Sequence, residues 1–397
     1  MSSNRNTLFP SIEMQNISRR SDESLTDFER AFNVRVMEIF TENRRMNLED
    51  FKVDTANFLK ALRVEFIWGE SGQTMYLTVT RLMRILKTSP QTIKDLLPHS
   101  IISTLVRITN FNMTIDISLI EHLVNSIIHA EDIYIKLLPY AENSTEISSY
   151  KLQDFVVAHY VPMMIEEPER TDYYSAYAVG IIFFLLDARR REYVFIKDLL
   201  SSTLLMHLEN CIRAENDSLP LPEIDVFTVA QFRSTLHEFR YLDTDRNGML
   251  SSAEMTCFRD GYFNAMFLQR VFDISMTYEN GFLDFKAFVD LMTAIRFRNT
   301  HASAKYHFEA LDLKNDGILD EDEIRTMACF QAQVLPEYVP DDNNVNIDIV
   351  TAELKDMLGL KTSGVDSEEF LANRMNSTFS GFLSNYADYL KYERREQ

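Results

Sequence analysis

The chain has 397 residues and is 46% hydrophobic and 25% charged, which is the composition of a globular protein with a sizeable core. Its length predicts two or three domains, since single cores seldom grow beyond roughly 250–300 residues. The formal net charge of −20 disfavours nucleic acid and anionic membranes as partners and favours divalent cations or basic protein surfaces. The three cysteines are far apart, so they predict neither a disulfide framework nor a zinc site, and a reducing cytoplasmic environment is expected.

The first part of the chain predicts a polar tail and then a helical domain. Residues 1–20 are polar and are expected to be a disordered tail. From 21 to 170, apolar residues recur three and four positions apart, as on the buried face of a helix. The apolar stretch 176–186 is too short to span a membrane and predicts a buried helix. Glycine and proline number 10 each, so strands joined by tight turns are scarce and an all-α fold is predicted. The helical pattern is clearest at 25–40, 80–87, 93–97 and 119–138.

The segment Asp187–Asp198, which we call the arginine loop, has the outline of an EF-hand calcium loop without its ligands. Such a loop has twelve residues, with oxygen ligands at positions 1, 3, 5, 7, 9 and 12. Here acids stand at both ends and Val194 at position 8, but Arg189 and Arg191 stand at positions 3 and 5. Repulsion should exclude calcium, which leaves two interpretations: a degenerate hand that completes a pair, or an acidic loop beside a helix.

The segment Asp243–Glu254, the first calcium loop, carries a suitable residue at every ligand position. Gly248 at position 6 permits the sharp turn, and Leu250 at position 8 supplies a short strand that pairs two such loops. With apolar helices on both sides, the pattern predicts an EF-hand that binds Ca²⁺. The alternative is an acidic turn between two helices that never meets calcium. The expected ligands, one of them the position 7 backbone carbonyl, come from Asp243, Asp245, Asn247, Met249, Ser251 and Glu254.

Two further units follow along the chain. Met276–Ala287, the silent hand, keeps the glycine and the strand position but has no ligand at either end, so it predicts a structural partner for the first calcium loop. Asp312–Glu323, the lysine loop, has Lys314 at position 3, where an ammonium group offers no lone pair. Either Lys314 swings outward and the loop binds calcium more weakly, or the loop keeps its form with little or no metal. Its expected ligands are Asp312, Asp316, Ile318, Asp320 and Glu323.

The remaining sequence sets the predicted domain boundaries. Residues 363–370 resemble the second half of a further hand, or an acidic loop beside a helix, and 207–225 is acidic with two prolines and predicts a linker or long surface loop. The predicted domains are a tail (1–20), a helical domain (21–170), a first EF-hand domain (171–300, with hands at 187–198, 243–254 and 276–287), a second EF-hand domain (301–375, with the hand at 312–323) and a C-terminal tail (376–397).

The sequence shows no signature of catalysis. His122 and His129 are seven residues apart on one helix face, which is too far for one metal without a third group. Neither a nucleophile elbow, a phosphate-binding glycine loop nor a paired cysteine and histidine occurs in the sequence. The chain is therefore expected not to be an enzyme.

Taken together, the ordered units resemble one protein family. The arginine loop, then FRYLDTDRNGMLSSAEM, MTYENGFLDFKAFVDLMTAI and YHFEALDLKNDGILDEDEI, are similar to the B-double-prime regulatory subunits of protein phosphatase 2A, most of all to the gamma branch, whose nematode relatives regulate spindle assembly. The similarity covers roughly residues 180 to 335. The chain departs from the family pattern at Lys314, because many members have the better calcium site in the later loop.

This resemblance implies a function. Such subunits bind the HEAT-repeat scaffold and the catalytic subunit of the phosphatase, and they direct its substrate choice and its location. The expected location is the cytoplasm, with the centrosome, spindle and nucleus as further sites and a centrosomal protein as recruiting partner; nucleic acid and membrane are not expected partners. The alternatives are a free-standing EF-hand calcium sensor that binds target helices and a metallohydrolase.

Overall fold

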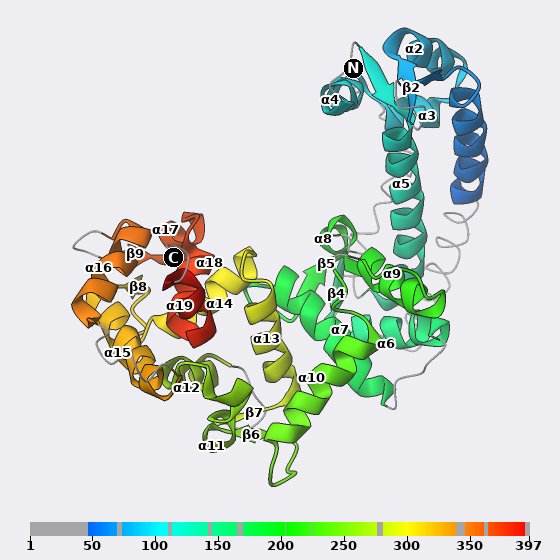
Figure 1. Cartoon of the computed structure of the whole chain (residues 1–397). Coiled ribbons are helices and arrows are strands. Elements are labelled where there is room, and N and C mark those ends of the chain that lie inside the picture. Colours follow the sequence, from blue (N-terminus) through cyan, green and yellow to red (C-terminus); the bar gives the residue numbers. More distant parts are fainter. Residues whose placement is uncertain are drawn as a thin grey trace, which may run out of the picture. The chain divides into compact units, whose positions relative to one another are not determined.

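A computed structural model of the chain forms two compact units, Met1–Ile147 and Ser148–Gln397. Figure 1 shows the elements in chain order. The structure describes residues 47–69, 74–109, 113–141, 145–164, 170–202, 204–222, 224–275, 281–338, 346–360 and 364–393. The predicted tail at 1–20 and the predicted helix at 25–40 lie outside these residues.

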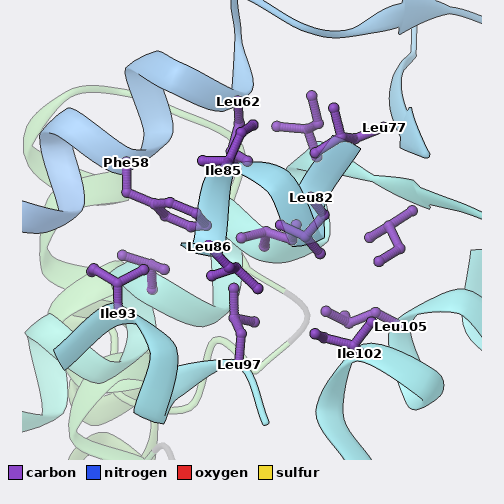
Figure 2. Packing of buried hydrophobic residues seen from close by; sticks show 14 of the residues in the cluster. Phe58, Leu62, Leu77, Leu82, Ile85, Leu86, Ile93, Leu97, Ile102 and Leu105 are labelled. Carbon is purple, nitrogen blue, oxygen red and sulfur yellow. The ribbon is translucent and has the colours of Figure 1, made fainter. Parts of the chain in front are cut away.

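The first unit consists of helices around a small antiparallel sheet with the strand order β1-β2-β3. Leu77 of β2 lies opposite Ile115 of β3, and both side chains are fully buried. They join a cluster of hydrophobic side chains contributed by the described α-helices of this unit (Figure 2). After a helix over 47–62, the elements are β1 (Ile67–Trp68), β2 (Met75–Thr78), α2 (Val79–Thr88), α3 (Gln91–Leu96), α4 (His99–Thr109), β3 (Thr114–Asp116), α5 (Ile117–Leu137), η3 (Leu138–Tyr140) and, at the boundary, β4 (Glu146–Ser148).

The helices predicted at 80–87, 93–97 and 119–138 are confirmed by α2, α3 and α5. The sequence did not predict how the elements of this unit are arranged. Each of β2 and β3 leads directly into a helix, and their pairing is that of two EF-hand loops. Met113, two residues before Ile115, has a φ of 57°, which is the left-handed turn that glycine makes in a calcium loop.

The second unit is built from helices and two-residue or three-residue strands. The apolar stretch at 176–186 forms the buried part of α7, as predicted, and α7 packs against α6 and α13. Among the described residues, no helix has both the length and the apolar character needed to span a membrane. The elements are α6 (Ser149–His159), η4 (Val161–Met163), α7 (Thr171–Leu186), β5 (Tyr193–Phe195), α8 (Ile196–Ser201), α9 (Leu204–Asn216), α10 (Val229–Leu242), β6 (Leu250–Ser251), α11 (Ser252–Met255), η5 (Phe258–Gly261), α12 (Ala265–Ile274), β7 (Phe282–Leu283), α13 (Phe285–Arg296), α14 (His301–Leu311), β8 (Ile318–Leu319), α15 (Glu321–Tyr338), α16 (Ile347–Leu358), β9 (Val365–Asp366), α17 (Ser367–Ala372), α18 (Asn376–Ser384) and α19 (Tyr386–Glu393).

Two predicted domain boundaries and one predicted linker differ from the structure. The units divide after Ile147 rather than at 170, and the predicted boundary at 300 lies inside the second unit, where α13 packs against α14. The segment predicted as a linker at 207–225 is helical up to Asn216, because Leu208, Cys211 and Ile212 recur at helical spacing and are buried.

The predicted C-terminal tail at 376–397 is also wrong over its described part, because α18 and α19 are packed helices. Phe379, Phe382 and Leu383 of α18 are buried, and α18 contacts α14, α15 and α16. The fully buried Asn264 holds the segment in place, since its amide donates to the carbonyls of Leu383 and Met327, each at 2.9 Å. The apolar residues of α18 therefore complete a core.

This packing predicts a large loss of stability on truncation of a buried aromatic residue. Phe382→Ala should lower the free energy of unfolding by about 3–5 kcal/mol, because it leaves a cavity that the surrounding helices cannot close. Ile349→Ala is the control, since that side chain is 59% exposed. Chemical denaturation of both variants measures the difference, and equal small effects would show that the segment is a tail after all.

Candidate calcium-binding loop

The first calcium loop and the silent hand are paired through their short strands, as predicted. Leu250 of β6 lies opposite Leu283 of β7, and both side chains are fully buried. Gly248 and Gly281 each stand two residues before the buried leucine and have φ values of 83° and 85°. The start of the silent hand, 276–280, lies outside the described residues.

The loop begins with Asp243, a buried carboxylate at the C-terminal end of α10. Its two oxygens accept hydrogen bonds from the backbone N–H groups of Asn247 and Gly248, each at 3.0 Å. These bonds draw the loop around the carboxylate and place Asp245 near it. The turn is possible because Gly248 adopts a left-handed conformation that costs glycine little.

Glu254 closes the loop from the other end. One carboxylate oxygen accepts from the backbone N–H and the hydroxyl of Thr244 at 2.8 and 2.9 Å, and the other accepts from the N–H and hydroxyl of Ser251 at 2.9 and 2.8 Å. Burial alone would raise the pKa of Glu254, but these hydrogen bonds outweigh it and lower the pKa to about 2. The carboxylate is therefore ionised over the whole physiological range.

The three acids of this loop form a group that fits a hard cation. Asp243, Asp245 and Glu254 each offer one oxygen, and these oxygens lie within 4.8 Å of one another. Asn247 holds the group together, since its amide donates to Asp245 at 3.0 Å and its oxygen accepts from the N–H of Met249 at 2.7 Å. Carboxylate and carbonyl oxygens are the ligands that Ca²⁺ prefers. The roles of Asn247, Ser251 and the Met249 carbonyl as ligands stay predictions.

The lysine loop has the same backbone but a different charge arrangement. Asp312 accepts from the N–H groups of Asp316 and Gly317 at 3.2 and 2.8 Å, as Asp243 does in the first loop. Lys314 does not swing outward; its ammonium group forms an ion pair with Asp320 across the loop. Among the described residues, the acids of this loop do not form a close group like that around Asp243. The ammonium group of Lys314 is therefore paired with Asp320, which is one of the predicted calcium ligands.

The last residues of the two loops, Glu254 in the first calcium loop and Glu323 in the lysine loop, also differ in their hydrogen-bond donors. Glu323 accepts from the backbone N–H groups of Lys314 and Asp320 at 2.9 and 3.0 Å. Leu313 and Asp320 stand where the first loop has Thr244 and Ser251, so the two hydroxyl donors are lost. Burial consequently raises the pKa of Glu323, whereas the pKa of Glu254 is lowered. The lysine loop is the poorer site for a divalent cation.

The arginine loop is a degenerate hand, which decides between the two interpretations left open by the sequence. Asp187 accepts from the N–H of Glu192 at 2.8 Å, and the guanidinium of Arg191 lies 3.2 Å from the same carboxylate. Arg190 and Glu192, at positions 4 and 6, have φ values of 52° and 65°, which match the left-handed turns of the other loops. Arg191 supplies a positive charge inside the loop, which agrees with the expected exclusion of calcium.

For the stretch 363–370 the sequence left two interpretations, the second half of a further hand or an acidic loop beside a helix. Val365 of β9 lies opposite Leu319 of β8, so this stretch completes a pair with the lysine loop. Glycine is required at position 364, where the chain enters β9 beside β8, because a Cβ there would lie 2.4 Å from the Ile318 side chain.

Comparison with known proteins settles the family. Three family models, described as the N-terminal, middle and C-terminal domains of RSA-1, match residues 25–131, 142–228 and 243–397. The chain is 62% identical over 398 residues to a Caenorhabditis elegans protein named serine/threonine-protein phosphatase 2A regulatory subunit rsa-1, and the match covers 100% of this chain and 98% of that protein. The chain belongs to the RSA-1 family of protein phosphatase 2A regulatory subunits.

More distant relatives place this RSA-1 family chain near the B-double-prime subunits, as the sequence motifs predicted. It is 28% identical over 225 residues to the B'' subunit gamma of Xenopus tropicalis, which covers 56% of this chain and 49% of that protein. A chain in a solved structure described as a PP2A PR70 holoenzyme aligns with a TM-score of 0.53 at 19% identity, over 66% of this chain and 98% of the other. That likeness concerns the fold, and it agrees with the predicted all-α architecture.

The first calcium loop should lose its ion when its last ligand is neutralised. We expect wild-type affinity on the order of 10⁻⁷–10⁻⁵ M, and Glu254→Gln should abolish binding because it removes a bidentate carboxylate. Titration calorimetry measures this, with Glu353→Gln on the exposed face of α16 as a control that should bind as the wild type does. Undiminished calcium binding by Glu254→Gln would disprove the assignment.

The lysine loop should gain affinity when its internal cation is replaced by a ligand. Lys314→Asp supplies the missing oxygen and releases Asp320 from its ion pair. Both changes favour calcium, so affinity should rise tenfold or more, or about 1.4 kcal/mol. Lys60→Asp in the first unit makes the same change of charge elsewhere and should leave calcium titration unchanged. Equal affinity of the lysine loop before and after Lys314→Asp would mean that the ion pair does not compete with calcium.

Proposed function

We propose that this chain is the regulatory subunit of a protein phosphatase 2A holoenzyme and that it binds both the HEAT-repeat scaffold and the catalytic subunit. The observation that carries the proposal is the 62% identity, over the whole chain, to a protein named as such a subunit. The acidic surface, with a net charge of −20, is suited to basic patches on its partners. In this role the chain directs the substrate choice and location of the phosphatase and has no phosphatase activity of its own.

The packing of α18 argues against the alternative of a free-standing sensor. Such a sensor exposes an apolar groove between its hands, into which a target helix fits. Here α18 packs against α14, α15 and α16, and Phe379 contacts Phe370 with ring centroids 6.0 Å apart. A target helix would have to displace these buried aromatic residues from the lysine-loop pair.

Calcium in this proposal is a structural clip in the first calcium loop. Asp243, Asp245 and Glu254 would hold the ion, which would neutralise three carboxylates that now lie close together. Thr244 and Ser251 already orient Glu254 toward the loop, so binding would tighten a preformed arrangement. The paired silent hand lacks ligands at its ends, which removes the cooperative partner that a calcium switch would use.

The proposed location is the cytoplasm, with recruitment to the centrosome and spindle by a centrosomal protein and access to the nucleus. This part rests on the family resemblance of the sequence. Imaging of the tagged chain through cell division tests it.

Assembly from purified components tests the main proposal. The chain, the scaffold and the catalytic subunit should elute from gel filtration as one stoichiometric complex at micromolar concentration. If calcium is a clip, Asp243→Ala should lower thermal stability and weaken assembly in proportion. A switch would instead leave the variant stable but unable to assemble, because a ligand shifts an equilibrium only by its different affinity for the two states. Separate elution of the wild type, with and without calcium, would overturn the proposal.

A further inference from the structure

A cavity of about 300 Å³ lies beside the arginine loop, within the second unit. It is bordered by the end of α7, the arginine loop, α13 and α14. Its volume is at the lower limit of the roughly 300–1,000 Å³ that is usual for ligand sites. That size suits a single long side chain better than a cofactor.

The arginine loop forms one wall of the cavity and is held firmly in that position. Arg190 donates to the backbone carbonyl of Ile274 and to Glu309, the latter at 3.2 Å. Lys305 donates to the backbone carbonyl of Ala188 at 2.6 Å. The left-handed conformations of Arg190 and Glu192 are unfavourable for residues with side chains, so these contacts keep the loop in a strained form. A loop that has lost its metal ligands thus retains a defined shape against the cavity.

Two polar groups that line the cavity lack partners. The hydroxyl of Tyr306 is buried and has no hydrogen-bond partner among the described residues. Asp290 is partly buried and takes part in no hydrogen bond or ion pair within the same residues. Burying an unpaired carboxylate costs free energy. The contacts of Asp290 among the described residues do not offset that cost, so Asp290 does not stabilise the fold through a pair. The ring of Phe184 lies 5.7 Å from the ring of Tyr306 and adds an apolar surface.

Among the described residues that line the cavity, Asp290 and Glu192 have no ion-pair partner; Glu192 is exposed to solvent, whereas Asp290 is partly buried. The lining has four carboxylates and three cationic groups. Asp187 is paired with Arg191, and Glu309 is paired with both Arg190 and Lys305. Lys286 stands one helical turn before Asp290 but is exposed and does not form an ion pair with it in the described structure. A further positive charge would therefore balance Asp290.

We propose that this cavity receives one basic side chain, arginine or lysine, from a partner polypeptide. Asp290 acts as the counter-ion, and the oxygen of Tyr306 accepts a hydrogen bond from the incoming group. Phe184 packs against the aliphatic stem of that side chain, and its ring face is suited to a cation. The overall charge of −20 favours such a basic partner over an acidic one. The proposal is independent of which protein supplies the side chain.

The titration of Asp290 agrees with this role. Burial raises its pKa to about 7, and the nearby Lys286 and Arg190 only partly oppose the shift. Since the folded pKa lies above the unfolded value, the carboxyl group favours the folded state below about pH 4, and this contribution is lost as pH rises through 7. The other charged or titratable groups that line the cavity are Asp187 and Glu192 of the loop and Lys305, Tyr306 and Glu309 of α14. The charge of Asp284, at the start of α13, also raises the pKa of Asp290.

Binding of small basic probes to the full chain tests the proposal. N-acetyl-arginine amide and N-acetyl-lysine amide should bind at pH 8 with a Kd on the order of 1 mM, measured by saturation-transfer NMR, and neutral N-acetyl-citrulline amide should not. Asp290→Asn should weaken binding at least tenfold, and so should Tyr306→Phe, which removes an unpaired hydroxyl and should leave the fold intact. Asp356→Asn, an exposed acid on α16, is the control and should bind as the wild type does.

Three outcomes would overturn the proposal: no binding of the basic probes, equal binding of the citrulline probe, or unchanged binding in Asp290→Asn. Inorganic phosphate serves as the anionic probe, and phosphate binding that is lost in Lys286→Met would make the cavity an anion site instead. Thermal unfolding provides a second readout. Asp290→Asn should raise Tm at pH 8 and raise it less at pH 5, whereas a structural role would lower Tm at both.

Discussion

Three hands of the second unit depend on one buried carboxylate at the start of the loop. Asp187, Asp243 and Asp312 are only 5, 8 and 5% exposed, and each accepts a hydrogen bond from the backbone N–H five residues later. A buried carboxylate is costly unless donors or a cation satisfy it, so the chain must curl around it. This requirement fixes the left-handed turns at positions 4 and 6 of all three loops, even where position 6 is Glu192 rather than glycine.

What differs between the loops is the source of positive charge. The arginine loop and the lysine loop carry a cation in their own sequence, Arg191 beside Asp187 and Lys314 beside Asp320. The first calcium loop has three close carboxylates and a low pKa at Glu254, and no such internal cation pairs with them. The strand pairs Leu250 with Leu283 and Leu319 with Val365 join the hands, and among the described residues the group of acids that fits a metal lies in one loop.

The sequence predicted those features that local chemistry determines. Ligand spacing located the first calcium loop, and a glycine two residues before an apolar strand residue located the silent hand. The hand formed by α4, β3 and α5 was missed because Met113 takes the glycine position and neither end of the loop carries an acid; the buried Ile115 between two helices was a weak signal. The packing of α18 into the core could not be predicted either. It depends on contacts with Asn264 and α14, which are distant in sequence. For the same reason, the sequence could not show that Lys314 pairs with Asp320 rather than pointing away.

These features agree with a regulatory subunit and differ from those of a free-standing sensor, which exposes a groove between its hands. In the second unit, α18 packs against the helices of the lysine-loop pair, and the arginine loop and the lysine loop each carry a cation of their own. Among the described residues, one group of three acids fits calcium. The number of calcium ions per chain tests this account most directly. Native mass spectrometry of the calcium-saturated full chain should show one tightly held ion that is lost in Asp243→Ala. Two or more such ions, or none, would contradict the view that each loop with a buried first carboxylate is satisfied either by its own cation or by calcium.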